Sequence, residues 1–220
     1  MKKLLVISYA IIITGIVFLG VIGVLLQKNN HSLVVKQEQH YQSYLLADIL
    51  RQSSDDLTRM ARTYVITGDE KYEKMYWDIL AIRNGESSQP QNYDRIYWDL
   101  VLNYGDKPQP DGEAIPLQTL MQKAGFTEEE WVKLREAHNN SDDLVKAETI
   151  AMNAMKGLYD DGNGNYVKQG EPDFEMARKI MHDADYHQYK AKIMRPIDEF
   201  LQLLDTRTAS HVVKQTHNWL

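Results

Sequence analysis

Two short segments carry the side chains best suited to binding a small molecule. Tyr72–Leu80 and Tyr93–Val101 align without a gap, with four of nine positions identical and five conservative. Each contains a Tyr-Trp-Asp triplet, which could offer an aromatic face to a cationic or planar ligand and a carboxylate as counter-charge. These candidate residues are Trp77, Asp78, Trp98 and Asp99. The alternative is that the aromatic residues form the core of a helical hairpin, because large rings dominate both cores and interfaces.

The stretch before these segments could hold an anion. Arg59 and Arg62 lie three residues apart, so on a helix they share a face and could bind a carboxylate through paired hydrogen bonds. Tyr64 follows them and completes the candidate ligand site. Ordinary ion pairs along the helix, with Asp55 between Arg51 and Arg59, explain the same pattern without a ligand.

Polar residues also interrupt otherwise apolar helical seams. Glu148 and Asn153 lie on one such seam, and Arg195 stands beside Pro196 on another, so all three could face a bundle interior. Because a buried charge needs a partner, we expect Glu148 to pair with an arginine, either as a structural contact or as part of a ligand site.

Catalytic and metal-binding patterns are incomplete. Asp161–Asn165 begins like a calcium loop, but Tyr166 and Pro172 stand where glycine and glutamate are required. His182 and His187 are five residues apart, the wrong spacing for two ligands on one helical face. The chain has no P-loop, nucleophile elbow or dinucleotide fingerprint. We therefore expect no enzyme, no metal site and no cofactor.

Composition excludes further classes of function. The net charge is −6 and no long basic run is present, so we expect no nucleic-acid partner. The absence of cysteine excludes disulfides, thiolate metal sites and thiol catalysis.

The N-terminal segment predicts a membrane anchor. Leu4–Leu26 holds 23 residues without a charge, and about 20 apolar residues span a bilayer. A secretory signal is shorter and ends in a small-residue cleavage motif, which is missing here, so an uncleaved anchor is favoured over a cleaved signal. Lys2 and Lys3 place the N-terminus in the cytoplasm. Residues 1–28 are thus the anchor with a short cytoplasmic start, and residues 29–220 the extracytoplasmic domain.

Helical spacing dominates the rest of the chain. Residues 31–67 contain no proline or glycine, and we expect the anchor to continue through them as one helix that ends before Gly68. The two Tyr-Trp-Asp segments predict a helical hairpin. Thr127 and Glu130 form a capping box before a second long helix to about Tyr159. Expected after it are a turn or hairpin over Asp160–Pro172, a short helix over Asp173–Asp183, and a third long helix over Asp185–Leu220, bent at Pro196.

These elements predict an all-α fold: an elongated bundle of long helices that run between membrane-proximal and distal ends, with short inserted helices. The order of anchor, long helix, distal insert and returning helix resembles the ligand-sensing ectodomain of bacterial transmembrane receptors. The family is that of methyl-accepting chemotaxis proteins, and the domain also occurs on sensor kinases and nucleotide cyclases. The stretches that carry the resemblance are Leu50–Arg62, Tyr64–Asp69, Tyr76–Leu80, Ala151–Leu158 and Met194–Phe200. The resemblance implies a homodimer that passes a signal through the membrane to a cytoplasmic module.

The resulting hypothesis is a periplasmic or extracellular sensor domain of the bacterial inner membrane that binds a small molecule. The alternative is an anchored module that docks a periplasmic partner protein and has no small-molecule pocket of its own. The chain stops at Trp219 and Leu220 in mid-helix, so we expect a second membrane span beyond it.

Overall fold

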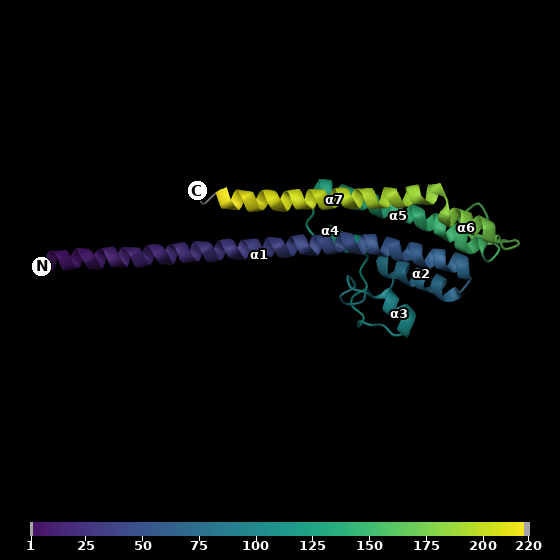
Figure 1. Ribbon diagram of the computed structural model, residues 1–220, viewed down its shortest axis with the longest axis horizontal. Helices are drawn as coiled ribbons and strands as arrows, with labels where there is room; N and C mark the ends of the chain where they lie inside the picture. Colours follow the sequence, from purple (N-terminus) through teal and green to yellow (C-terminus); the bar gives the residue numbers. More distant parts are fainter. Residues whose placement is uncertain (1, 218–220) are drawn as a thin grey trace. The chain divides into compact units, whose positions relative to one another are not determined.

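The computed structural model describes residues 2–217, which form seven helices and one two-stranded sheet (Figure 1). The predicted all-α helical class is confirmed. The chain divides into two compact units, one made of residues 1–41 with residues 208–220, and one made of residues 42–207.

Helix α1 spans Lys2–Thr67 without interruption, as expected for an anchor that continues into the following segment. An 18-residue stretch of it reaches a mean hydropathy of 2.7, and none of that stretch is buried. By length and composition this helix could cross a membrane. Gly68, with a φ of 67°, ends α1, and its backbone N–H donates to the Tyr64 carbonyl at 2.7 Å.

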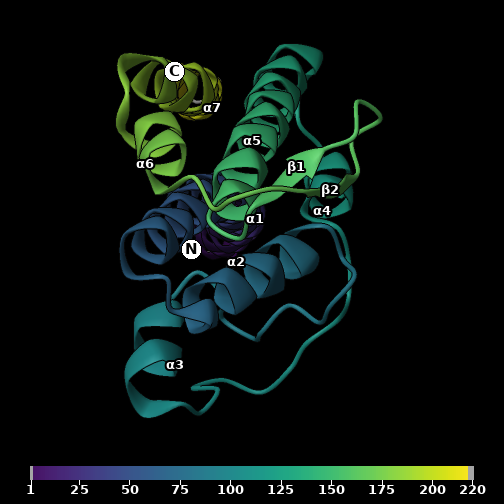
Figure 2. The same ribbon diagram turned by 90° about the vertical axis from the view of Figure 1, so that its right-hand side faces the viewer.

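The second unit contains the hydrophobic core. Its other elements are α2 (Glu70–Arg83), α3 (Trp98–Tyr104), α4 (Leu117–Lys123), α5 (Glu128–Ala154), β1 (Leu158–Asp160), β2 (Tyr166–Gln169), α6 (Phe174–His182) and the first part of α7 (Ala184–His217). Seen end-on, α2, α5 and α7 surround the C-terminal part of α1 (Figure 2). Leu50, Met60, Leu134, Ile193 and Phe200 are completely buried among these helices.

The start of α5 is as predicted, but its end is not. The Thr127 hydroxyl accepts from the Glu130 N–H at 3.2 Å, and the Glu130 carboxylate accepts from the Thr127 N–H at 2.9 Å, which completes the capping box. The helix ends at Ala154 and not near Tyr159. Gly157 then adopts a φ of 67° and lies so close to the Gly170 carbonyl that a Cβ would be 2.2 Å from its oxygen.

The strands that follow explain the shorter helix. Leu158–Asp160 pairs antiparallel with Tyr166–Gln169, so the predicted hairpin is present but begins two residues before Asp160. At the C-terminal side, the third long helix is present as α7, which starts one residue before the predicted Asp185 and continues through Pro196. The last three residues of that prediction, 218–220, lie outside the described residues.

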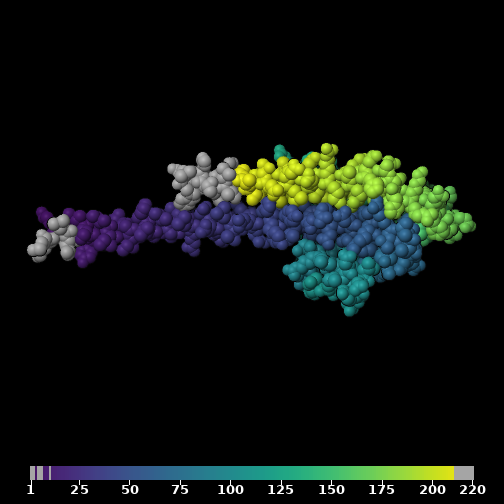
Figure 3. Space-filling view, viewed as in Figure 1, coloured from purple at the N-terminus to yellow at the C-terminus, as the bar shows by residue number. Residues whose placement is uncertain are grey.

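The predicted helical hairpin is wrong in its second half. The first Tyr-Trp-Asp segment lies within α2, but residues 93–97 are not helical, and α3 begins only at Trp98. Asn92 has a φ of 51°, and its carbonyl accepts from the Arg95 N–H at 3.0 Å, which starts a turn in place of a helix. The segment between Gly85 and Pro116, called the lobe below, appears largely in teal in the space-filling view, where it lies against α1 and α2 (Figure 3).

The two ends of this lobe meet. Gly85, directly after α2, lies so close to Pro116, directly before α4, that a Cβ would be 2.3 Å from the Pro116 nitrogen. Between them, the Gln89 N–H donates to the Glu113 carbonyl at 3.0 Å, and the Gly112 N–H donates to the Gln89 carbonyl at 2.8 Å. The lobe is therefore a closed excursion from the bundle.

Candidate functional site

The first Tyr-Trp-Asp triplet divides its side chains between core and surface. Tyr76 is fully buried, whereas Trp77 is 39% exposed and packs edge-on against the Tyr76 ring at 5.0 Å. Asp78 pairs with Lys74, one turn earlier, at 2.9 Å. In the first triplet, Trp77 is therefore the aromatic side chain with a face open to solvent.

The second triplet is arranged differently. Trp98 is only 4% exposed, and its indole N–H donates to the Tyr93 hydroxyl at 2.7 Å. Tyr97 packs edge-on against both rings, with centroid distances of 5.0 Å to Trp98 and 5.5 Å to Tyr93. Asp99 is the exposed member, and it forms an ion pair with Arg59 of α1. Here the tryptophan is part of the core of the lobe.

The two candidate arginines have different partners. Arg59 pairs with Asp99 and also, at 2.9 Å, with Asp56. Arg62 instead donates from Nε to the Met181 carbonyl at 2.9 Å, and its guanidinium lies 4.6 Å from the centre of the Tyr186 ring. Its Nη2 atom is buried and has no hydrogen-bond partner among the described residues. Arg59 therefore fastens the lobe to α1, whereas Arg62 connects α1 with α6 and α7.

Burial shifts the pKa of two groups on this part of α1. Burial raises the pKa of Asp56 to about 6, although the neighbouring Arg59 charge opposes the shift. The candidate residue Tyr64 is also buried, and burial together with the charges of Glu73 and Glu70 raises its pKa to about 12. Tyr64 is therefore an uncharged core residue at neutral pH.

A buried carboxylate joins four helices. Glu148 of α5 is 1% exposed. Its Oε2 accepts from the Tyr76 hydroxyl of α2 at 2.9 Å, and its Oε1 accepts from the Tyr186 hydroxyl of α7 at 2.6 Å. Thr58 of α1 lies 3.3 Å from Oε1 and 2.9 Å from the Tyr186 hydroxyl. Three hydroxyl groups from three helices thus enclose this carboxyl group.

The expectation that Glu148 pairs with an arginine is therefore wrong. The buried arginine of the neighbouring helix, Arg83, instead donates to the Ser141 hydroxyl at 2.7 Å and to the Asp142 carboxylate at 2.8 Å. His138 lies 3.6 Å from Asp142, and burial lowers its pKa. Asp142 lies half-exposed at the edge of the bundle, which lets Arg83 keep a solvated counter-charge.

The other two polar residues predicted on the seams differ from each other. Asn153 is buried, and its side-chain amide donates to the Thr149 carbonyl of its own helix at 2.9 Å. The Arg195 side chain is 83% exposed and lies 3.6 Å from Glu199. The expectation that Arg195 faces the interior is wrong, because its position on α7 points to solvent.

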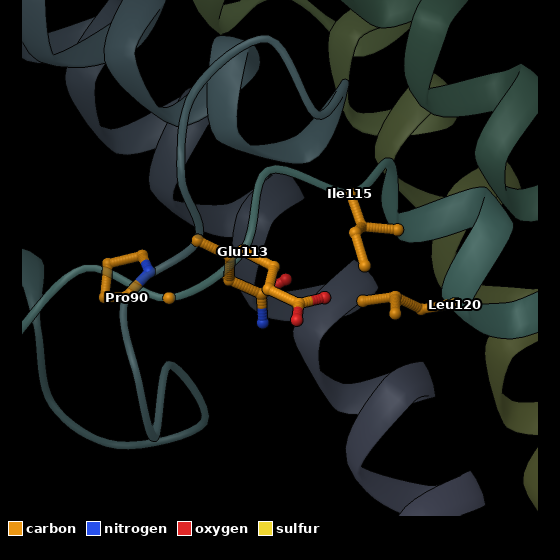
Figure 4. Close-up of a pocket in the computed structure, with 6 residues that line it drawn as sticks. Pro90, Glu113, Ile115 and Leu120 are labelled. Atoms are coloured by element: carbon orange, nitrogen blue, oxygen red, sulfur yellow. The ribbon is translucent and has the colours of Figure 1, made fainter.

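Two open hollows of the second unit bear on ligand binding. The first measures about 490 Å³ and lies on α2; its lining residues are Glu70, Lys71, Glu73, Lys74 and Trp77. The second measures about 190 Å³ and lies at the closed base of the lobe (Figure 4). Its lining residues are Gln89, Pro90, Gly112, Glu113, Ile115 and Leu120. Of the predicted ligand residues, Trp77 alone contributes to either hollow.

The candidate calcium loop is a hydrogen-bonded turn. The Asp161 carboxylate accepts from the Asn163 N–H at 2.8 Å, and Gly162 and Gly164 have φ values of 97° and 86°. Within residues 2–217, no group of three or more histidine, aspartate or glutamate side chains is placed to hold a metal ion.

No protein-family model matches this chain, and neither the curated proteins nor the solved structures give a match.

Proposed function

We propose that the chain is the extracytoplasmic sensor domain of a membrane-anchored signalling receptor. The observation that carries the proposal is the composition of α1. Its N-terminal part is apolar and unburied, as a membrane span would be, and its C-terminal part supplies the core residues Leu50, Leu57, Met60 and Ala61 of a helical bundle. One continuous helix thus carries both the anchor and the centre of the domain.

This arrangement supports a simple mechanism. A ligand that binds one packing of the bundle more tightly than another shifts the population toward that packing. Because α1 has no break between the apolar segment and the core, a small displacement of its core part is passed along the helix. Homodimer formation, as the receptor resemblance implies, belongs to the same proposal.

The surface around Trp77 is the proposed contact for a small molecule. Trp77 presents an open indole face, and the charges beside it are held in ion pairs, Lys74 with Asp78 at 2.9 Å and Glu73 with Lys156 at 2.6 Å. This surface lies next to Tyr76 and hence next to the buried carboxyl group of Glu148. A ligand there could alter the packing of α2 against α5.

Selective labelling tests the topology. The natural chain has no cysteine, so Lys3→Cys and Val167→Cys each create one reactive thiol at an exposed position. In intact cells, a membrane-impermeant maleimide should label Val167→Cys, and should label Lys3→Cys only after lysis. Labelling of neither variant before lysis would show that the bundle lies in the cytoplasm and would overturn the proposal.

A thermal-shift screen of the detergent-solubilised chain against small metabolites tests ligand binding. Binding to the folded state stabilises it by about 2.7 kcal/mol at a hundredfold excess over Kd. Trp77→Ala should abolish the shift, whereas Trp131→Ala, at a partly buried tryptophan of α5 that lines a different hollow, should leave it intact. If Trp77→Ala retains the full shift, the ligand binds elsewhere.

The second candidate function is docking of a partner protein. It is favoured by two large apolar side chains on the lobe, Ile96 and Tyr104, which are 68% and 72% exposed. In this case Ile96→Ser and Tyr104→Ser should weaken capture of the partner while the melting temperature stays unchanged.

A further inference from the structure

The carboxyl group of Glu148 belongs to a chain of hydrogen-bonded hydroxyl groups, and the hydrogens in this hydroxyl chain can be donated in either of two directions. From α5 to α1 the chain runs from Glu148 Oε1 to the Tyr186 hydroxyl (2.6 Å), then to the Thr58 hydroxyl (2.9 Å), then to the Ser54 carbonyl (3.0 Å). Each hydroxyl group has one hydrogen to donate, so the direction of donation depends on whether Glu148 carries a proton.

With Glu148 ionised, the carboxylate can only accept. Tyr186 donates its single hydrogen to Oε1, and Tyr76 donates to Oε2. Thr58 is closer to the Ser54 carbonyl than to Oε1, at 3.0 Å against 3.3 Å, so its hydrogen goes to the carbonyl. In this form α7 is hydrogen-bonded to α5, and the contact between the Tyr186 and Thr58 oxygens carries no hydrogen.

With Glu148 protonated, every link still has a partner. Oε1–H donates to the Tyr186 oxygen, Tyr186 turns its hydrogen to the Thr58 oxygen, and Thr58 continues to donate to the Ser54 carbonyl. Tyr76 donates to Oε2 as before. Proton uptake therefore adds a hydrogen bond between α7 and α1 and leaves each side-chain oxygen of Glu148, Tyr186 and Thr58 with a hydrogen-bond partner.

We propose that Glu148 is a proton-binding site of the bundle, and that proton uptake reverses the hydroxyl chain and joins α7 to α1. The binding step stands on these contacts alone. Its consequence, that the domain responds to external acidity, rests on the proposed sensor function.

The charged groups around Glu148 are engaged elsewhere. Arg83 of α2 is bound to Asp142, Arg62 of α1 lies over the Tyr186 ring, and Lys190 of α7 is 2.8 Å from Asp55. Among the described residues, none forms an ion pair with Glu148. On the same helix as Glu148, His138 and Asp142 lie together, and Asp142 pairs with Arg83. Among the described residues, the hydrogen-bond partners of this carboxyl group are therefore hydroxyl groups.

Burial favours the protonated form. It raises the pKa of Glu148 above 4.5, against the lowering effect of its hydrogen bonds with Tyr186 and Tyr76. The folded state thus binds a proton at a pH at which the unfolded state releases it. Consequently this group adds stability as the pH falls through its folded pKa towards 4.5, and that stability is absent at higher pH.

The first experiment follows the Glu148 carboxyl carbon by NMR in the full chain, labelled with ¹³C in glutamate side chains and held in detergent micelles. The resonance is assigned by its loss in Glu148→Gln. We expect a titration midpoint above 4.5. A midpoint at or below 4.5 would overturn the proposal.

Two substitutions test the direction of the chain. Tyr186→Phe removes a hydrogen bond in both forms, but the bond to the ionised carboxylate is the stronger one, so the midpoint should rise, by roughly one unit. Thr58→Val removes the acceptor that Tyr186 needs only in the protonated form, and should lower the midpoint by a similar amount. Shifts in the same direction would show that Thr58 donates to the carboxylate, which rules out the reversal.

These outcomes are separate from those of the labelling test. Cysteine accessibility reports topology whatever Glu148 does, and the titration reports proton binding whichever side of the membrane holds the bundle. Should Glu148→Gln fail to fold, the opposite shifts in Thr58→Val and Tyr186→Phe still decide the proposal, because the one resonance that moves in both variants identifies Glu148.

Discussion

The two Tyr-Trp-Asp segments share a triplet but not an environment. In the first, tyrosine is buried and hydrogen-bonded to Glu148, while Trp77 faces solvent. In the second, Trp98 is buried against Tyr93, while Asp99 reaches out to α1. The difference follows from the backbone: the first triplet lies inside α2, whereas in the second Tyr97 precedes α3 and only Trp98 and Asp99 are helical. The same three side chain types therefore leave the backbone in different directions.

The largest expected effect separates the two tryptophans. Trp98→Ala removes a buried ring and its hydrogen bond to Tyr93, and should lower the free energy of unfolding by about 3–5 kcal/mol. Trp77→Ala, the same change at a 39% exposed site, should cost about 1 kcal/mol or less. Chemical denaturation of both variants measures the difference. Equal losses would contradict the distinction between core and surface.

Replacing the tyrosine of each triplet should also change the free energy of unfolding by different amounts, with a smaller difference than for the tryptophans. Tyr76→Phe leaves the buried carboxyl group of Glu148 with one donor fewer and should cost about 1–3 kcal/mol. Tyr97→Phe keeps the ring packing and breaks no hydrogen bond seen between described side chains, so it should be nearly neutral. Thermal melts of the pair test this, and a comparable loss in Tyr97→Phe would indicate a partner for its hydroxyl group.

Asp56 of α1, which shares Arg59 with Asp99 of the second segment, should also contribute a pH dependence, because burial raises its pKa. Asp56 has a pKa of about 6 when folded and 3.8 when unfolded, so between these values the folded state alone holds the proton. Its contribution to the unfolding free energy therefore rises as the pH falls from 6 to 3.8, by at most about 1.4 kcal/mol per pH unit. In Asp56→Asn this part of the slope should vanish.

Stability curves at several pH values, with Asp55→Asn as the control for a neighbouring, half-exposed aspartate, measure that change. An unaltered slope in Asp56→Asn would show that this carboxyl group is solvated, and would remove the electrostatic difference between the two segments.

The smallest effects belong to the aspartates. Asp78→Asn breaks an exposed ion pair within α2 and Asp99→Asn breaks one between the lobe and α1, and each should cost about 0.2–1 kcal/mol. The two substitutions should also differ in their effect on the lobe. Loss of the Asp99 contact should increase hydrogen exchange across the lobe, whereas loss of the Asp78 contact should leave the lobe unchanged.

Elements set by local signals could be predicted from the sequence. The glycine after Thr67, the capping box at Thr127 and the apolar run at the N-terminus each predicted the element that the structure contains, since these signals act within a few residues. The end of α5 could not be predicted, because it depends on pairing between Leu158–Asp160 and strand β2 farther along the chain.

Contacts between helices were the least predictable part. Polarity on a seam identified Glu148 as buried, but Tyr76 and Tyr186 could be recognised as its partners only from the packing of three helices. Thr58 did leave a signal, as a polar residue on the same apolar face as Leu57 and Ala61. Such a signal shows that a partner exists without showing which helix supplies it.

The contact between Gly85 and Pro116 has a consequence for how sequences of this kind can diverge. Because the chain leaves the bundle and returns to it at one point, the residues between form a cassette with its own internal packing around Trp98. Insertions, deletions or replacement of the whole cassette should leave the positions of α2 and α4 in the bundle unaltered. Relatives should therefore vary most in this stretch, and natural or designed replacements of it could change what the surface recognises while the helices beneath stay the same.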